Sequence, residues 1–457
     1  MPELPPGPAT LAIADDATFV DTPRWNVPTR IAFRFAFCYF VLYALCCGNA
    51  TLWEVIPFHI GEHIENWLVW PFKHGAQWLV QHHSHIHGIG AKLHDTGSGD
   101  TVIDWTAAGL MLSLAITAAL LWTLLDRRSL AYPRLFGWFR FILRLTLAVA
   151  MMGYGFAKLY PFQMAPPSLA VLNEPFGNLS PMTLLWTMIG LNPLYEMICG
   201  AVEVVSGLLI LFRRTALLGA LLTAFVVSNV VLYNFFFDVP VKLYASHLLL
   251  MAIVLVIPDL RPLFQFFWQH RPAAPTLPWS PWPLGTTGKK RFIEPAILAL
   301  VLFSGAILPL VQGWGQYKHM RANINKPADI TGQWHVDSAT FAGQPKPFLT
   351  GDGLPLTDLY FEPSGRVMAR AADNALWRGG ADINDKKKTF TLYVQAHGDD
   401  GVNYSFTKPD STHLILTPIK DSAKTEPTLN LSRVPLPQHY PLLDRGFHLV
   451  NEWGLER

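Results

Sequence analysis

Charged and polar side chains interrupt three strongly apolar stretches of this sequence. In chain order the stretches hold Arg144 and Lys158, then Glu196 and Glu203, then Asn229, Lys242 and His247. An ionised group inside lipid costs at least about 3 kcal/mol, so such residues usually pair within a helix bundle or line a site. The chemistry that they suggest is acid–base chemistry inside a membrane.

Two of these residues are expected to form a structural ion pair. A helix rises about 1.5 Å per residue, which puts Arg144 about 12 Å into one apolar segment and Glu203 at a similar depth in the next. Facing each other there, the two side chains would compensate two buried charges. We therefore predict an Arg144–Glu203 pair.

A second polar layer is expected nearer the outer surface. Glu196, Asn229 and His247 each fall about 9 Å below the predicted outer boundary. Imidazole ordinarily titrates near neutral pH, so His247 is a candidate proton carrier, with Glu196 as its partner. Lys158 and Lys242, at the mouth of this layer, would attract an anion or a quinone oxygen. The alternative is that all five are structural contacts between helices.

A histidine cluster lies in the connection after the first apolar segment. It contains His82, His83, His85 and His87. Alternating histidines in an extended segment suit Cu or Zn. Because no cysteine or carboxylate set accompanies them, the alternative is a solvated segment at the membrane interface.

The composition indicates a polytopic membrane protein. Of 457 residues, 51% are hydrophobic and 15% are charged, whereas soluble domains carry about 25% charged residues. A net charge of +2 argues against a nucleic-acid partner. The lipid bilayer is the expected surrounding.

Seven apolar runs are long enough to cross a bilayer. They lie near 31–50, 104–125, 136–156, 190–212, 215–236, 241–258 and 293–313. Most basic residues near the runs lie before the first run or after the second, fourth and sixth, which are all on one side of the membrane. The positive-inside rule therefore predicts a cytoplasmic N-terminus and a C-terminal part outside. This corresponds to a bacterial inner membrane with a periplasmic C-terminal domain.

Residues 324–457 read as a small antiparallel β domain of six or more strands, because alternating segments are separated by turn residues. Gly332, Gln333 and Trp334 resemble the start of lipocalin-like barrels, and Arg433 is expected to pack on Trp334. Such a barrel often holds an apolar ligand. The alternative is a filled barrel that packs on the membrane domain.

Residues 136–258 resemble the DoxX family of bacterial membrane proteins. The matching positions are Arg144, Gly153, Gly155, Lys158, Glu203 and Gly207. The resemblance implies a four-helix membrane bundle, and some members of the family act in quinone-dependent thiosulfate oxidation or in thiol redox defence. Three further spans and the β domain depart from the family, and the lack of an external cysteine argues against thiol chemistry.

These expectations give an α-helical polytopic membrane protein with a C-terminal all-β barrel. The predicted parts are a cytoplasmic segment (1–30), two spans with a His/Trp-rich outer connection (31–135), the DoxX-like core (136–258), a cytoplasmic linker (259–292), the seventh span (293–313) and the β domain (324–457).

The predicted function is quinone-linked redox or proton transfer at a pocket facing the periplasm. The alternative is non-enzymatic: binding of a lipid or another hydrophobic ligand, or service as an accessory subunit with membrane or periplasmic partners.

Overall fold

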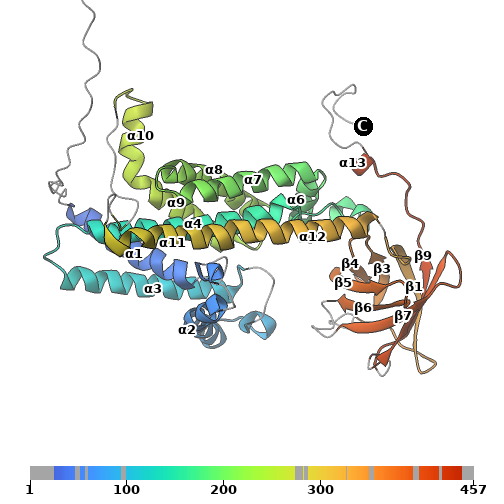
Figure 1. Ribbon diagram of the computed structural model, residues 1–457. Helices are drawn as coiled ribbons and strands as arrows, with labels where there is room; N and C mark the ends of the chain where they lie inside the picture. The colour runs from blue at the N-terminus through green and yellow to red at the C-terminus, as the bar shows by residue number, and fades with distance from the viewer. Residues whose placement is uncertain are drawn as a thin grey trace, which may run out of the picture.

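The structure is a computed structural model that joins a helical domain to a β-barrel (Figure 1). It describes residues 25–46, 52–56, 60–93, 99–272, 281–282, 287–325, 327–347, 349, 355–394, 401–420, 422 and 425–444. We call the end of the helical domain next to the barrel the barrel side, and the opposite end, where residues 260–272 and 287–292 lie, the linker side.

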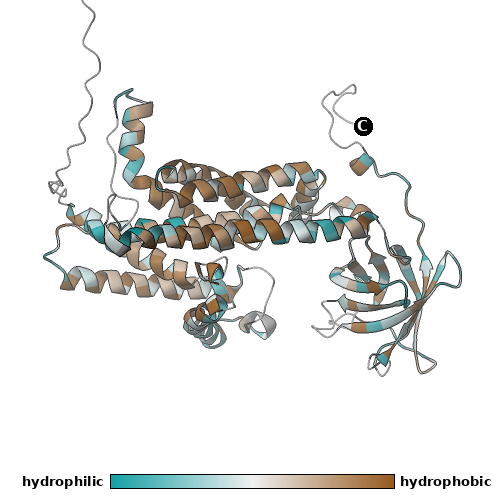
Figure 2. Ribbon diagram, viewed as in Figure 1, coloured by the Kyte–Doolittle hydropathy of each residue, from teal (hydrophilic) through white to brown (hydrophobic). Residues whose placement is uncertain are grey.

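Seven helices of the described residues are long and apolar enough to cross a membrane. They are α1 (Val27–Cys46), α3 (Val102–Leu125), α4 (Pro133–Leu159), α7 (Pro193–Leu211), α8 (Ala216–Phe236), α9 (Lys242–Val256) with its extension to Phe267, and the long helix formed by α11 (Ile293–Leu302), η6 (Phe303–Ile307) and α12 (Leu308–Asn325). Apolar residues predominate along them (Figure 2). The predicted helical membrane part is thus confirmed.

Shorter helices connect these elements. They are η1 (Leu52–Val55), α2 (Ile60–His83), η2 (Gly88–Ala91), α5 (Leu169–Leu172), η3 (Phe176–Asn178), α6 (Pro181–Gly190), η4 (Ile257–Asp259), α10 (Leu260–Phe267), η5 (Gly288–Phe292) and, after the barrel, α13 (Pro441–Asp444). The His/Trp-rich connection contains α2, which exposes three tryptophans: Trp67, Trp70 and Trp78.

Helix α4 is the centre of the helical domain, because 78% of the residues in its most apolar 18-residue stretch are buried. It packs closely against α7 because glycines on both helices remove side chains from the contact. A Cβ added to Gly200 would lie 2.5 Å from the Gly155 carbonyl oxygen, and one added to Gly207 would lie 2.9 Å from the Ala148 carbonyl oxygen. These contacts set the register of the two antiparallel helices.

The seventh span is longer than the sequence suggested. We expected it to end near residue 313, but the helix continues to Asn325 and carries the chain to the barrel. The Tyr160 hydroxyl donates a hydrogen bond to the Leu310 carbonyl (2.6 Å), which ties α12 to the end of α4. Between α11 and α12, the segment η6 forms one wide π-helical turn.

The C-terminal domain is a closed, antiparallel, up-and-down barrel of eight strands. Its strands are β1 (Gly332–Phe341), β3 (Leu356–Phe361), β4 (Arg366–Ala371), β5 (Leu376–Asn384), β6 (Thr389–Val394), β7 (Val402–Thr407), β8 (His413–Pro418) and β9 (Thr428–Arg433), and the short β2 (Gln344–Pro345) extends beside β1. Strand β9 pairs with β1 and closes the barrel, which leaves no long unpaired edge.

Trp334 seals the barrel core as expected from its place on the first strand. Its side chain is fully buried, and its indole N–H donates to the Ile330 carbonyl (2.8 Å). The Arg433 guanidinium lies 5.7 Å from the indole ring centre, as predicted. Phe361, Phe390 and other buried aromatic side chains pack inside the barrel. This packing favours the filled-barrel alternative.

The barrel docks on the connection between α4 and α6. The Glu362 carboxylate accepts a hydrogen bond from the backbone N–H of Leu169 (2.7 Å), and Arg370 forms an ion pair with Glu174 (2.5 Å). Ala170 is buried between them against strands β3 and β4. The membrane domain therefore holds the barrel through α5 as well as through α12.

Candidate functional site

A buried ion pair lies between the two central helices. Lys158, on α4, places its Nζ 2.7 Å from both carboxylate oxygens of Glu203, on α7. Lys158 is 8% exposed and Glu203 is 3% exposed. The pair is thus withdrawn from solvent and compensated within the bundle.

The predicted Arg144–Glu203 pair is wrong, because Arg144 serves the end of α7 instead. Its guanidinium donates to the carbonyls of Ile210 (3.2 Å) and Leu211 (2.6 Å) and lies 3.8 Å from the Glu294 carboxylate. These carbonyls have no partner within their own helix, so a cation stabilises them.

The helix register explains the error. The glycine contacts place Gly155 beside Gly200 and Ala148 beside Gly207, so the two antiparallel helices keep one register along this contact. In that register Arg144 lies level with residue 211, which is eight residues, or about 12 Å, from Glu203. Lys158 reaches Glu203 instead, since helical side chains lean toward the N-terminus of their helix.

His247, on α9, meets the first span. Its Nε2 lies 2.6 Å from the Tyr39 hydroxyl, and its ring stacks on Tyr43 with centres 3.7 Å apart. Its Nδ1 lies 2.7 Å from the Leu243 carbonyl oxygen, which can only accept, so Nδ1 carries the proton in a neutral ring and Nε2 accepts from Tyr39. His247 is thus one end of a hydrogen-bonded pair that crosses from α9 to α1.

The expected layer of Glu196, Asn229 and His247 does not form. Glu196 is buried, and its carboxylate accepts the backbone N–H of Met164 (2.9 Å), so it braces the connection after α4. Asn229 is exposed on α8. Depth along a helix does not say which way a side chain points, so an estimate of depth alone could not place these three side chains together.

Lys242 also lies apart from the expected mouth of a site. Its Nζ forms an ion pair with Asp238 four residues earlier (2.7 Å). The Asp100 carboxylate accepts the backbone N–H groups of Lys242 and Leu243 and thereby caps the start of α9. Capping of this kind satisfies the first N–H groups of a helix.

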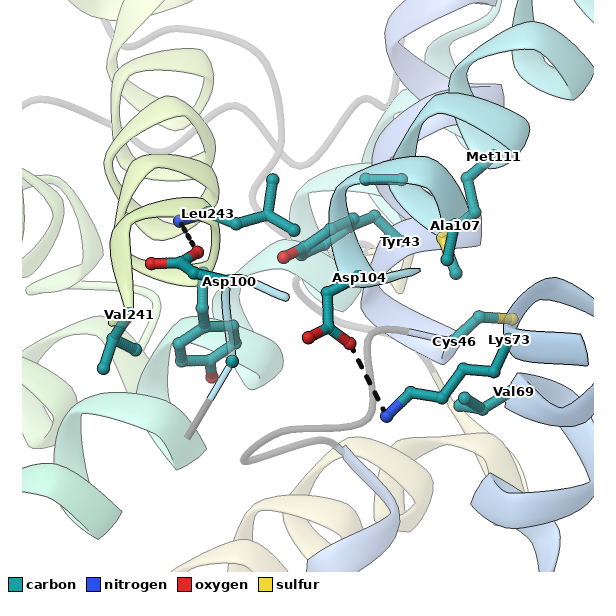
Figure 3. A pocket seen from close by; sticks show the side chains of 13 residues that line it. Tyr43, Cys46, Val69, Lys73, Asp100, Asp104, Ala107, Met111, Val241 and Leu243 are labelled. Atoms are coloured by element: carbon teal, nitrogen blue, oxygen red, sulfur yellow. Dashed lines mark hydrogen bonds and ion pairs between the residues drawn. The ribbon is translucent and has the colours of Figure 1, made fainter. Parts of the chain in front are cut away.

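A small pocket, mostly apolar but lined also by Lys73, Asp100 and Asp104, opens beside these groups, between α1, α2, α3 and α9 (Figure 3). Its volume is about 40 Å³, which suits a few water molecules, since one needs about 10–15 Å³. Lys73 and Asp104 point toward each other across it, with Nζ 3.7 Å from the carboxylate. Organic ligands usually occupy about 300–1,000 Å³, so this pocket suits water and protons.

Tyrosine side chains connect the pocket to the buried ion pair. Tyr43 and Tyr244 both line the pocket, and Tyr43 stacks on the histidine ring described above. The ring centres of Tyr244 and Tyr154 are 6.0 Å apart, and Lys158 Nζ lies 5.8 Å from the Tyr154 ring centre. Contacts between aromatic rings, and a cation–π contact at Tyr154, therefore lead from the pocket to Lys158 and Glu203.

Sequence reasoning missed the residues that line this pocket. A signal was present for Asp104, because Thr101 and Asp104 have the spacing of a helix N-terminal capping box and form one. Tyr39 and Tyr43 are four residues apart, on one face of α1. Lys73 gave no signal, since its partner Asp104 lies on another helix.

The histidine cluster does not converge on a centre. His82, His83, His85 and His87 are exposed at the end of α2, and the His82 ring stacks on Trp78 at 4.8 Å. Across the described ranges, three or more His, Cys, Asp or Glu side chains nowhere gather as a metal site would require. A solvated interfacial segment is the simpler description.

Comparison with known proteins gives one informative relative. No protein-family model matches the sequence, and no solved structure matches it. A stretch of 130 residues is 33% identical to the uncharacterized protein YwoB of Bacillus subtilis (strain 168), and it covers 28% of this chain and 80% of that protein. On this similarity, the chain belongs to the same family as YwoB.

Proposed function

We propose that this chain is a DoxX-like integral membrane protein whose helical domain transfers protons between the pocket and the buried Lys158–Glu203 pair, in support of quinone-linked redox chemistry. The observation that carries the proposal is that Tyr43 and Tyr244 line the pocket beside Lys73 and Asp104, and that ring contacts lead from Tyr244 through Tyr154 to the ion pair.

The chemistry of the pair suits this role. Lys158 and Glu203 lie at hydrogen-bond distance, so one proton moved from ammonium to carboxylate turns an ion pair into two neutral groups. In a medium of low polarity the two forms lie closer in free energy than in water, because neither has a full hydration shell. Such a pair can accept a proton on one side and release it on the other.

The pocket volume separates proton transfer from quinone binding. A space of about 40 Å³ does not enclose a quinone ring. The proposal therefore gives this chain the proton-transfer part of the reaction, with quinone meeting a lipid-facing surface or a partner subunit.

The topology that we propose puts the barrel in the periplasm of a bacterial inner membrane. Exposed basic side chains gather on the linker side, including Arg127, Arg128, Arg214 and Arg291. The positive-inside rule then makes the linker side cytoplasmic.

Proton flux into proteoliposomes tests the proposal. With a membrane potential imposed and a pH dye enclosed, Glu203→Gln should reduce flux by about a hundredfold or more, the lower end of the range for loss of an acid–base group. The matched control is Glu196→Gln, which changes a second buried carboxylate of α7 and keeps an acceptor for the Met164 N–H. It should leave flux unchanged.

A double variant that folds shows whether a loss of flux comes from misfolding or from loss of the ion pair. Lys158→Met/Glu203→Met leaves no lone charge in the bundle, so it should fold and still lack flux. Wild-type flux no greater than that of empty liposomes, or full flux in the double variant, would refute the proposal. Copurifying subunits together with absent flux would instead support the accessory-subunit alternative.

A further inference from the structure

Helix α10 leaves the direction of the bundle at a fixed corner. In Figure 1 it runs across the axes of α4, α8 and α12 at the linker end of the helical domain. Asp259, at the corner, is buried and forms an ion pair with Arg140 of α4 (2.6 Å), and the same guanidinium donates to the Leu255 carbonyl (3.2 Å). This bond holds α10 in the plane that a bilayer surface would occupy.

One face of α10 is apolar and uncovered. Leu260, Leu263, Phe264, Phe267 and Trp268 recur at spacings of three and one, which puts them on one side of a helix. Of these, Leu263 packs on the bundle, whereas Phe264 is 52%, Phe267 68% and Trp268 76% exposed. Arg261 borders this face, and the opposite side carries Gln265, Gln269 and the exposed Phe266.

The exposed charges around this helix are basic. Arg261 and Arg271 flank its apolar face, and further exposed basic side chains on the linker side are Arg127, Arg128, Arg134, Arg214, Lys290 and Arg291. The acidic side chains that the structure describes here, Asp126, Asp259 and Glu294, already bond to neighbours. The surface is therefore complementary to anionic headgroups.

We propose that α10 lies in the headgroup region of the membrane on the linker side and binds anionic phospholipid. Its aromatic face enters the boundary of the acyl chains, and Arg261 and Arg271 contact lipid phosphates. This surface is separate from the proton-transfer groups, so the inference stands whether or not they conduct. A protein partner on the same face is the competing occupant, and the test below distinguishes the two.

Hydrogen–deuterium exchange of the purified full-length protein in nanodiscs tests the proposal. Amides of residues 260–271 should exchange more slowly in discs of phosphatidylcholine with phosphatidylglycerol than in phosphatidylcholine alone. Each arginine near an anionic surface contributes roughly fivefold, so the two together should slow exchange by about thirtyfold. Higher salt should reduce the difference.

Variants separate the contribution of the arginine–phosphate contacts from the contribution of the aromatic face. Arg261→Gln/Arg271→Gln should remove the response to phosphatidylglycerol, and Phe264→Ser/Phe267→Ser should speed exchange in both kinds of disc. The matched control Gln265→Ser/Gln269→Ser, on the opposite face, should behave as wild type. Equal exchange in both lipids, an unaltered response in the arginine variant, or protection that requires a copurifying protein would overturn the proposal.

Discussion

Glu203 pairs with Lys158 and not with Arg144 as predicted, which shows what a sequence can say about single residues. The presence of buried, compensated charges in these helices was expected from the cost of ionised groups in lipid. The pairing was not, because it depends on a register that is set by glycine contacts between α4 and α7. Charge type could be predicted from the sequence, but charge partner could not.

The first prediction concerns the ion pair. Lys158→Met should destabilise the protein by about 3–5 kcal/mol, because it leaves the Glu203 carboxylate without its buried partner. Lys158→Met/Glu203→Met should recover most of this loss. Thermal unfolding in detergent measures both, and a single variant as stable as the double would contradict the expectation.

A second prediction concerns His247. In His247→Phe the ring can still stack on Tyr43, but the Tyr39 hydroxyl loses its acceptor (2.6 Å in the native protein). The cost should be about 1–3 kcal/mol, the price of an unsatisfied buried polar group. Tyr39→Phe/His247→Phe should be more stable than His247→Phe alone. The same unfolding measurement decides, and equal stability of the two would count against this hydrogen bond.

At the scale of elements, close packing of α4 on α7 is the central feature of the helical domain. It can be tested at two glycines, one inside the contact and one outside it. A Cβ at Gly200 would lie 2.5 Å from the Leu159 backbone nitrogen, whereas a Cβ at Gly153 meets nothing within 4 Å. Gly200→Ala should therefore cost about 1–3 kcal/mol through overpacking, and Gly153→Ala should be neutral or slightly stabilising. Comparison of the melting temperatures of the two variants checks this.

Most elements could be predicted from the sequence, and the exceptions have physical causes. The spans follow from long apolar runs, and most strands follow from alternation. Strand β5 has little local signal, because LWRGGADIN has two glycines and no sustained alternation, and it becomes a strand through pairing with β4 and β6 on either side. Partners on different elements, such as Lys73 and Asp104, depend on tertiary packing and had no local signal.

At the scale of the whole molecule, the docking of the barrel on α5 should depend on pH. Burial raises the pKa of the Glu362 carboxyl above its ordinary value, and Arg366 partly opposes this. The docked state thus binds a proton more readily than the undocked state, so this contribution is present at low pH and is lost as pH rises through the raised pKa. Arg370 and Glu174 are the other charged groups of this interface.

Glu362→Gln tests that dependence. The amide oxygen can still accept the Leu169 N–H, but it does not titrate, so the variant should lose this part of the pH dependence of unfolding. Calorimetry between about pH 5 and pH 8, the range in which protein stability usually peaks, provides the measurement. A pH profile identical to that of wild type would show that Glu362 does not contribute.

The long helix from Ile293 to Asn325 has a mechanical consequence. At one end Glu294 is clamped to Arg213, and at the other end a short connection leads from Asn325 into the first barrel strand. A displacement of this helix along its axis at the linker side therefore moves its other end, which leads into the barrel. The π-helical turn at Phe303–Ile307 is the one departure from α-helical geometry along the described length of this helix, and turns of this kind are frequent at functional sites.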